Sequence, residues 1–139
     1  AMAYSTRPKG MKPKAPARKG IEGKALPIIE IAPLHGFYNY KNKYQAGSTI
    51  ETCPADIPQN LTARMQKHAE EACAAVDIEG YARVDFMLDA RSGEDYALEV
   101  NTLPGMTPTS LLPQEAGALG YSFEQLCEWL LQVSMKKYE

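Results

Sequence analysis

The sequence predicts an α+β domain in which helices flank an antiparallel sheet. Three features support this fold class: two neighbouring strand-like segments joined by a short polar turn, a helix-like segment before them, and a capping motif that opens a helix near the C-terminal end. The chain has 139 residues, of which 45% are hydrophobic and 23% are charged, so it is long enough to form one domain with a substantial core.

Basic residues are concentrated at the beginning of the chain. Residues 1–24 contain seven Lys and Arg against one acid, whereas residues 25–139 contain eight against sixteen acids. A basic arm of this kind is typical of contacts with nucleic acid, but the many Pro and Gly residues and the near absence of apolar periodicity favour disorder. We therefore expect residues 1–23 to be a disordered or expression-derived leader, residues 24–139 to be the folded lobe, and nucleic acid not to be a partner.

The cysteines and the hydropathy pattern favour the cytoplasm. Cys53, Cys73 and Cys127 are widely spaced and include no CxxC motif, which suits reduced thiols better than disulfides or a zinc site. No apolar run approaches the roughly 18–20 residues that cross a bilayer, and no signal-peptide pattern is present. We therefore expect a cytoplasmic protein with no membrane partner.

The first elements are a strand, a long loop and a helix. Residues 24–32 predict a strand because they are apolar and β-branched. Residues 33–57 predict a long loop with a cluster of tyrosines and lysines, and loops of this length are usually functional or mobile. Residues 58–77 predict a helix that has Pro58 at its first position, because apolar residues recur at spacings of three and four. His68 lies on this apolar stripe, so we expect it to be packed in the core.

The next two elements form a β-hairpin. Residues 81–88 and 96–101 predict the strands, and the polar segment between them predicts a turn with Ser92 and Gly93 at its tip. A helix is expected to follow, from near Ser110 to Gly120. The last helix is expected to begin at a Ser-x-x-Gln capping box formed by residues 122–125.

Polar residues at a spacing of two mark the predicted hairpin as the candidate site. Asp85 lies on one strand, Glu99 and Asn101 lie on the other, and each strand places its alternate residues on one face. Two carboxylates and an amide form a hard oxygen-ligand set that suits Mg²⁺ or Mn²⁺. The alternative is an ordinary solvated face with cross-strand ion pairs.

Three further residues have suitable chemistry for a reacting anion. Arg83 shares the face of Asp85, and its permanent charge would stabilise oxygens that gain negative charge. Gly105 allows the backbone to approach an anion closely. Ser110, at the beginning of a helix, offers a hydroxyl to a carboxylate.

Longer runs of sequence resemble one enzyme family. The segments GYARVDFMLD, ALEVNTLPGMTPTSLLPQEA and SFEQL are similar to the C-terminal region of the D-alanine–D-alanine ligases, which belong to the ATP-grasp superfamily. The earlier segments ALPIIEI, FYNYKNKY and CPAD are similar to the same enzymes in the same order. The resemblance covers about residues 24–135 and implies the C-terminal lobe of an ATP-grasp fold.

The resemblance implies that ATP activates one D-alanine as an acyl phosphate and that a second D-alanine attacks it, in peptidoglycan synthesis, cell wall biogenesis and the maintenance of cell shape. It implies that two Mg²⁺ or Mn²⁺ ions bind Asp85, Glu99 and Asn101. Arg83 and Gly105 would then be catalytic. The substrate-binding residues would be Ser110, Leu111 and, in a mobile lid, Lys43 and Tyr44. The adenine would contact Met87 and Leu98, for which core packing is the alternative.

The sequence also departs from this family. The N-terminal and central domains, which carry the first substrate's anchor and the ATP-binding lysines, have no counterpart here. The missing domains would be partners of this chain, together with ATP, D-alanine and a second copy in a homodimer. An alternative function is that of a truncated, non-catalytic ATP-grasp remnant acting as a binding module, and the second substrate could also be D-lactate or D-serine.

Overall fold

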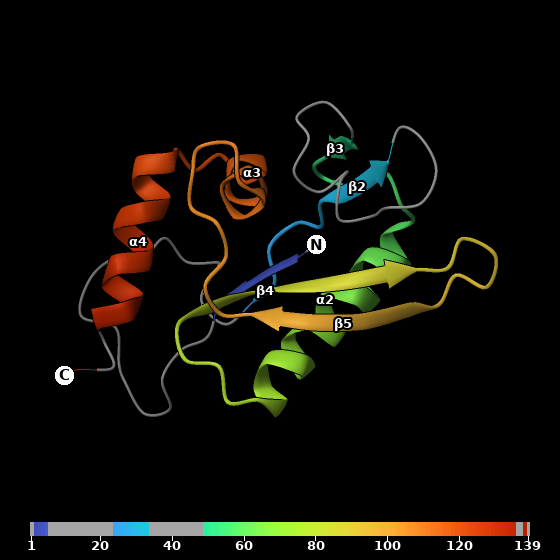
Figure 1. Ribbon diagram of the computed structural model, residues 1–139, viewed down its shortest axis with the longest axis horizontal. Coiled ribbons are helices and arrows are strands. Elements are labelled where there is room, and N and C mark those ends of the chain that lie inside the picture. Colours follow the sequence, from blue (N-terminus) through green and yellow to red (C-terminus); the bar gives the residue numbers. More distant parts are fainter. Residues whose placement is uncertain (1, 6–23, 34–48, 136–137, 139) are drawn as a thin grey trace.

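The computed structural model describes residues 2–5, 24–33, 49–135 and 138, and confirms the α+β class. Helices cover one face and one end of a small antiparallel sheet (Figure 1). In chain order the elements are β1 (Met2–Ser5), β2 (Glu30–Pro33), β3 (Thr49–Thr52), α2 (Gln59–Ala75), β4 (Tyr81–Leu88), β5 (Asp95–Asn101), α3 (Leu111–Ala118) and α4 (Phe123–Met135).

The predicted hairpin is confirmed, and its first strand, β4, is the central strand of the sheet. Strands β1, β4 and β5 pair in that order, and every pairing is antiparallel. The register places Asp85 opposite Glu99, and a β-bulge follows between Asp85 and Phe86. The turn between the strands has Gly93 with a φ of 70°, a left-handed conformation that glycine adopts without strain.

Residues 2–5, which belong to the expected leader, are part of the sheet. These residues form β1, in which Met2 lies opposite Val84 and Ser5 lies opposite Tyr81. The Pro and Gly residues that favoured disorder begin only at Pro8. They therefore carry no information about the first residues, which bond through their backbone to β4. Residues 6–23 lie outside the described part of the chain.

The segment before α2 also differs from expectation. The strand expected over residues 24–32 is limited to the four residues of β2, although Leu26, Ile28 and Ile29 before it are buried. The loop expected over residues 33–57 contains β3, which pairs with β2. Short strands of this kind depend on a partner that is distant in sequence, so local patterns do not reveal them.

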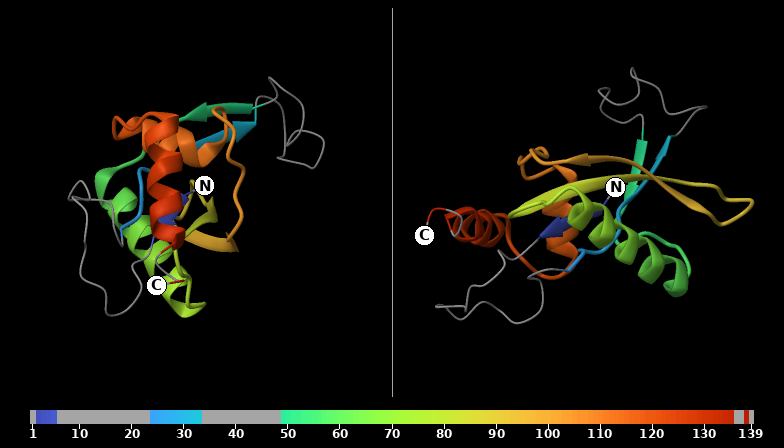
Figure 2. Two further views of the ribbon diagram at one scale, coloured as in Figure 1. Left: turned by 90° about the vertical axis from the view of Figure 1, so that its left-hand side faces the viewer. Right: turned by 90° about the horizontal axis from the view of Figure 1, so that it is seen from below.

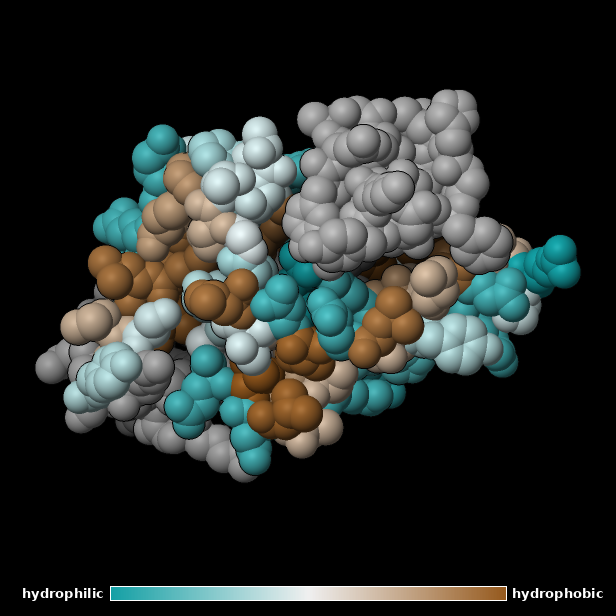
Figure 3. Space-filling view, in the orientation of Figure 1, coloured by the Kyte–Doolittle hydropathy of each residue, from teal (hydrophilic) through white to brown (hydrophobic). Residues whose placement is uncertain are grey.

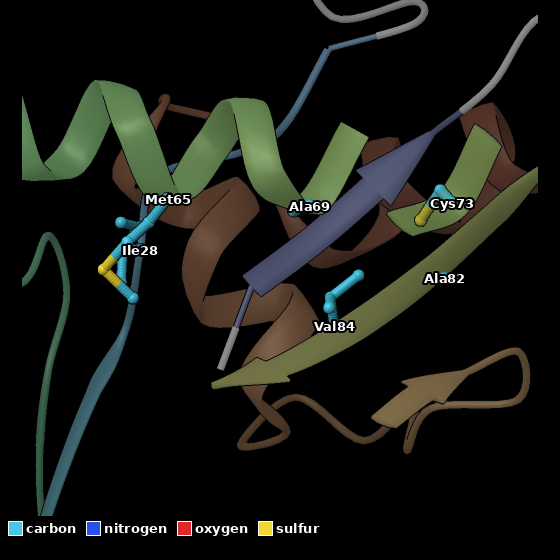
Figure 4. Close-up of a cluster of buried hydrophobic side chains, with 6 residues drawn as sticks. All are labelled: Ile28, Met65, Ala69, Cys73, Ala82 and Val84. Carbon is cyan, nitrogen blue, oxygen red and sulfur yellow. The ribbon is translucent and has the colours of Figure 1, made fainter. Parts of the chain in front are cut away.

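The main core lies between α2 and one face of the sheet. Figure 2 shows α2 running along the β4–β5 hairpin, and Figure 4 shows the buried side chains between them. The cluster comprises Ile28, Met65, Ala69, Cys73, Ala82 and Val84. Because Ala82 and Val84 face this core, the alternate residues of β4 must face away from it. The opposite face of the hairpin is therefore free to carry polar side chains.

A second core cluster packs α3 and α4 together. Its buried residues are Leu26, Leu112, Ala116, Leu126 and Leu130. The predicted capping box is confirmed at the beginning of α4, because the Gln125 N–H donates to Ser122 Oγ at 3.2 Å and the Ser122 N–H donates to Gln125 Oε1 at 3.1 Å. Helix α3 begins one residue after Ser110, and α2 begins after Pro58, one position later than expected.

Helix α2 is bound to the hairpin by a charged cluster that sequence reasoning did not predict. The Asp95 carboxylate, only 2% exposed, accepts hydrogen bonds from Arg64 Nε at 2.8 Å and His68 Nδ1 at 2.6 Å. Arg64 also donates to the carbonyl of Gly93. His68 is 42% exposed, so its assignment to the packed core is wrong. Its place on the apolar stripe is explained by Asp95, which offers the imidazole a charged partner beside the core.

No helix in the described ranges is both long enough and apolar enough to cross a membrane.

Candidate functional site

The candidate site lies on the hairpin face that points away from α2. Arg83 and Asp85 on β4 are directly opposite Asn101 and Glu99 on β5. Residues directly opposite one another in an antiparallel pair have neighbouring side chains. The structure therefore brings together the four hairpin residues that sequence reasoning selected.

Arg83 and Asp85 form a two-pronged ion pair along one strand. Arg83 Nε donates to Asp85 Oδ1 at 2.7 Å and Arg83 Nη2 donates to Asp85 Oδ2 at 2.9 Å. Glu99 is more remote, with Oε1 at 3.9 Å from Arg83 Nη2. The Arg83 side chain is 13% exposed, whereas that of Glu99 is 57% exposed. Arg83 therefore occupies both oxygens of Asp85 and leaves Glu99 largely open to solvent.

Carboxylates surround the guanidinium of Arg83. The hydrogen bond to Asp85 raises the pKa of Arg83, and burial opposes this effect. The fields of the carboxylates of Asp85, Glu99 and Glu115 raise this pKa further. Arg83 is therefore positively charged at every pH at which the protein is folded.

The donor set fits a metal ion that arrives with its own ligands. Among the described residues, no three His, Cys, Asp or Glu side chains are grouped in a way that could hold a metal ion. The hairpin instead offers two carboxylates, Asp85 and Glu99, together with the amide of Asn101. Asn101 Oδ1 accepts the N–H of Leu103 at 3.0 Å and keeps a second lone pair. Mg²⁺ uses one or two carboxylates and completes its shell with water and substrate phosphates, so the residues fit a magnesium–nucleotide site.

The loop after β5 approaches the beginning of α3. A Cβ atom at Gly105 would lie 3.0 Å from Ser110 Oγ, so any larger residue would require the serine to shift by a few tenths of an ångström. Ser110 is the N-cap residue of α3, and Leu111 is the first residue of that helix. Gly105, Ser110 and Leu111 are therefore grouped at a helix N-terminus, where backbone N–H groups favour an anion.

The two residues expected at the adenine are both exposed. Met87 is 55% exposed on the β4 face that carries Asp85, and Leu98 is 61% exposed on β5. Leu98 borders a shallow apolar groove between β5 and the end of α2, and Figure 3 shows hydrophobic side chains gathered in this region. The core-packing alternative is therefore wrong for both side chains. Lys43 and Tyr44 lie outside the described residues.

Sequence reasoning missed one buried carboxylate near the site. Glu115 on α3 is 0% exposed, and its field acts on Arg83. Burial raises the pKa of the Cys53 thiol to about 11, and the field of Glu115 contributes to this shift. Glu115 lies three residues after Leu112 and one before Ala116, both of which are buried. This helical spacing is the signal that could have revealed it.

The fold and the site define a class of protein. The antiparallel hairpin has carboxylate and amide side chains on one face and a helix on the other, and the solved structures that it resembles assign it to the C-terminal lobe of an ATP-grasp fold. The family model described as "D-ala D-ala ligase C-terminus" matches residues 19–132, and the chain belongs to this family.

Individual relatives agree with this assignment. The chain is 50% identical over 111 residues to a D-alanine–D-alanine ligase of Anaeromyxobacter sp., and the match covers 80% of this chain and 36% of the relative. It is 43% identical over 119 residues to that of Methylacidiphilum infernorum, and the match covers 86% of this chain and 39% of the relative. The chain thus spans about two fifths of the length of these relatives.

A solved structure shares the fold. The D-alanine–D-alanine ligase of Bacillus anthracis, crystallised with ATP, superposes with a TM-score of 0.67 at 38% sequence identity. The superposition covers 82% of this chain and 35% of that enzyme. This agreement extends the family assignment from sequence to three-dimensional structure.

Proposed function

We propose that this chain is the metal- and phosphate-handling lobe of an ADP-forming D-alanine–D-alanine ligase that acts in the cytoplasm. The observation that carries the proposal is the polar hairpin face, on which Arg83 and Asp85 lie opposite Asn101 and Glu99. Such a face suits phosphoryl transfer, in which the protein contributes positioning and charge stabilisation more than covalent chemistry.

The proposed reaction has two steps. A carboxylate oxygen of one D-alanine forms a bond to the γ-phosphorus of ATP, and the bond from that phosphorus to the β-γ bridging oxygen breaks, which releases ADP. The amine of a second D-alanine then bonds to the acyl carbon of the resulting acyl phosphate. The carbon–oxygen bond to phosphate breaks, phosphate leaves, and the amine loses a proton to solvent. The product, D-alanyl-D-alanine, would be used in peptidoglycan synthesis.

The hairpin residues would hold the polyphosphate end of ATP. Asp85, Glu99 and Asn101 would hold two Mg²⁺ or Mn²⁺ ions, which when bound neutralise phosphate charge. Glu99 is available for this role because it is 57% exposed and its Oε1, at 3.9 Å from Arg83 Nη2, is beyond hydrogen-bond distance. Asp85 must first give up its two hydrogen bonds with Arg83. Engagement of the metal site would therefore release the Arg83 guanidinium.

The released Arg83 would bind the transferred phosphate. Its side chain is 13% exposed and its charge is permanent, so it meets the phosphate with little competition from water. A planar guanidinium donates two parallel hydrogen bonds to phosphate oxygens as readily as to a carboxylate. Arg83 would then stabilise the tetrahedral intermediate that forms when the second D-alanine attacks.

The loop and α3 would bind the second D-alanine. Gly105, where a Cβ would lie only 3.0 Å from Ser110 Oγ, would bring its backbone close to the developing oxyanion. The Ser110 hydroxyl and the N–H of Leu111 would receive the carboxylate of the second D-alanine at the helix N-terminus. The acyl phosphate would thus lie between the hairpin and this carboxylate site.

The remaining contacts involve the rest of a ligase. Met87 and Leu98 would pack against the adenine, which their exposure of 55% and 61% permits. Lys43 and Tyr44 would belong to a lid that excludes water from the acyl phosphate. The N-terminal and central domains of a complete ligase would bind the first D-alanine and the other side of ATP, and the complete enzyme would form a homodimer.

The test replaces the proposed metal ligands in the complete ligase that contains this lobe. Asp85→Asn and Glu99→Gln should each lower D-alanine-dependent ADP release by at least about two orders of magnitude, because each removes a carboxylate from phosphoryl transfer. Glu71→Gln is a matched control, since Glu71 is 60% exposed on the surface of α2 and, among the described residues, forms an ion pair only with Lys67. Near-normal rates in both hairpin variants would refute the proposed function.

A further inference from the structure

The Ser110 hydroxyl is the centre of a hydrogen-bond network within its own loop. The N–H of Thr107 donates to Ser110 Oγ at 3.0 Å, and the Thr107 hydroxyl lies 2.8 Å from the same atom. The N–H of Ser110 donates back to the carbonyl of Thr107 at 2.9 Å. Thr107 therefore makes three hydrogen bonds with Ser110, two of which fix the position of the hydroxyl.

Within this network, the Ser110 side chain does not cap its helix as an N-cap serine usually does. An N-cap hydroxyl usually accepts the N–H of the second or third residue of its helix. Ser110 makes no such side-chain bond, although its backbone is extended as in a typical N-cap. The third helical residue is Pro113, which has no N–H to offer. The N–H groups of Leu111 and Leu112 are thus left without a capping side chain.

The lone pairs and the single hydrogen of the Ser110 hydroxyl determine which hydrogen bonds it can still form with a ligand. A serine oxygen has two lone pairs and carries one hydrogen. The N–H of Thr107 uses one lone pair. If the Thr107 hydroxyl donates to the other lone pair, the only remaining capacity of Ser110 is its own O–H. A ligand carboxylate, which only accepts hydrogen bonds, favours this direction and strengthens the chain from Thr107 through Ser110 to the ligand.

The geometry points to Thr107 as a positioning residue that makes Ser110 a dedicated hydrogen-bond donor to the carboxylate of the second D-alanine. This inference rests on the proposed function and adds Thr107 as the residue that sets the direction of the hydrogen bond between Ser110 and the substrate carboxylate. Gly105 leaves room for this arrangement, because a Cβ there would lie 3.0 Å from Ser110 Oγ, and the serine would have to shift by a few tenths of an ångström.

The experiment measures steady-state kinetics of the complete ligase with four variants. Thr107→Val removes the hydroxyl, keeps the N–H and preserves the shape, whereas Thr107→Ser restores the hydroxyl. Thr109→Val is the matched control, because Thr109 Oγ1 is 3.4 Å from Thr107 Oγ1 and makes no contact with Ser110 Oγ in the described hydrogen bonds. Ser110→Ala removes the proposed donor itself.

Thr107→Val should raise KM for the second D-alanine by about tenfold, as expected from the loss of one hydrogen bond to a charged group. KM for ATP and the rate at saturating D-alanine should change less than threefold. The preference for D-alanine over D-alaninamide, which lacks the carboxylate, should fall by the same factor as KM rises. Thr107→Ser and Thr109→Val should behave like the unaltered enzyme.

Two failures are distinguishable. If Ser110→Ala leaves KM and the preference over D-alaninamide unchanged, the carboxylate site in the proposed function is wrong. If Ser110→Ala changes both but Thr107→Val behaves like Thr109→Val, Thr107 does not position Ser110, and the proposed function stands. Melting temperatures are measured for all variants, and Thr107→Ala replaces Thr107→Val if valine lowers the melting temperature by more than a few degrees.

Discussion

Replacing Arg83 with methionine should strengthen divalent-metal binding by this chain even though Arg83 is a proposed catalytic residue. In the structure Arg83 makes hydrogen bonds of 2.7 and 2.9 Å to both oxygens of Asp85. A metal ion that takes those oxygens must therefore break the pair. Methionine has a similar length and no charge, so it leaves Asp85 free and removes the repulsion between the guanidinium and the ion.

The size of the effect follows from the two hydrogen bonds. A hydrogen bond to a charged group contributes roughly 1.5–3 kcal/mol. The pair is largely but not fully buried, with side-chain exposures of 13% and 23%, so solvent weakens it and a total of about 1–3 kcal/mol is appropriate. Metal affinity should therefore rise by roughly 5- to 150-fold. In the complete ligase the same substitution should reduce D-alanine-dependent ADP release by about two to three orders of magnitude.

The assay follows free Mn²⁺ by electron paramagnetic resonance while the purified chain is titrated. Arg91→Met is the control, because it removes one positive charge from the exposed turn between β4 and β5 and leaves Asp85 paired. Unchanged or weaker Mn²⁺ binding by a folded Arg83→Met variant would show that Arg83 and the metal do not compete for Asp85. The proposed release of Arg83 by metal binding would then be refuted.

Three further outcomes are expected. Asp95→Asn should lower the free energy of unfolding at pH 7 by about 1–2 kcal/mol, a value discounted for the partial exposure of Arg64 and His68, and urea unfolding would measure it. Burial raises the pKa of Asp95, but the hydrogen bonds from His68 and Arg64 outweigh burial, and the pKa is lowered below its ordinary value. The stabilisation by Asp95 is therefore fully present above the ordinary aspartate pKa and is lost as the pH falls through the lowered value. The difference in stability between variant and parent should accordingly shrink below about pH 4. Ser122→Ala should cost about 0.5–2 kcal/mol by breaking the capping box of α4, and an equal stability would contradict the role of that box. The isolated chain should release no D-alanine-dependent phosphate from Mg-ATP, since it spans only about two fifths of its relatives, and robust release would disprove the need for further domains.

The hairpin and its polar face could be predicted because the relevant information is local. Ala82 and Val84 alternate with Arg83 and Asp85, so a period of two separates the core face from the site face within a few residues. The short turn limits the possible registers, and the register with Asp85 opposite Glu99 keeps the apolar residues on one side. The capping box of α4 was predictable for the same reason, since its two partners are three residues apart.

The features that could not be predicted depend on partners that are distant in sequence. Strand β1 is identified only by its pairing with β4, about 80 residues further along the chain. His68 reads as a core residue until Asp95 is placed beside it, 27 residues away. In both cases the structure is decided by a contact with a residue distant in sequence, which the local pattern does not reveal.

The short segment of residues 26–28 explains how the two halves of the candidate site, the β4–β5 hairpin and the loop with α3, keep their relative position. The hairpin residues rest on the cluster that contains Ile28, whereas the loop and α3 rest on the cluster that contains Leu26. These two residues are separated by one position, and α2 binds the same segment through a hydrogen bond from Gln66 Nε2 to the Leu26 carbonyl at 3.0 Å. A close-packed interior transmits small displacements instead of absorbing them. The packing of residues 26–28 into both clusters should therefore set the distance between Arg83, at the phosphate end of the proposed reaction, and Ser110, at its carboxylate end.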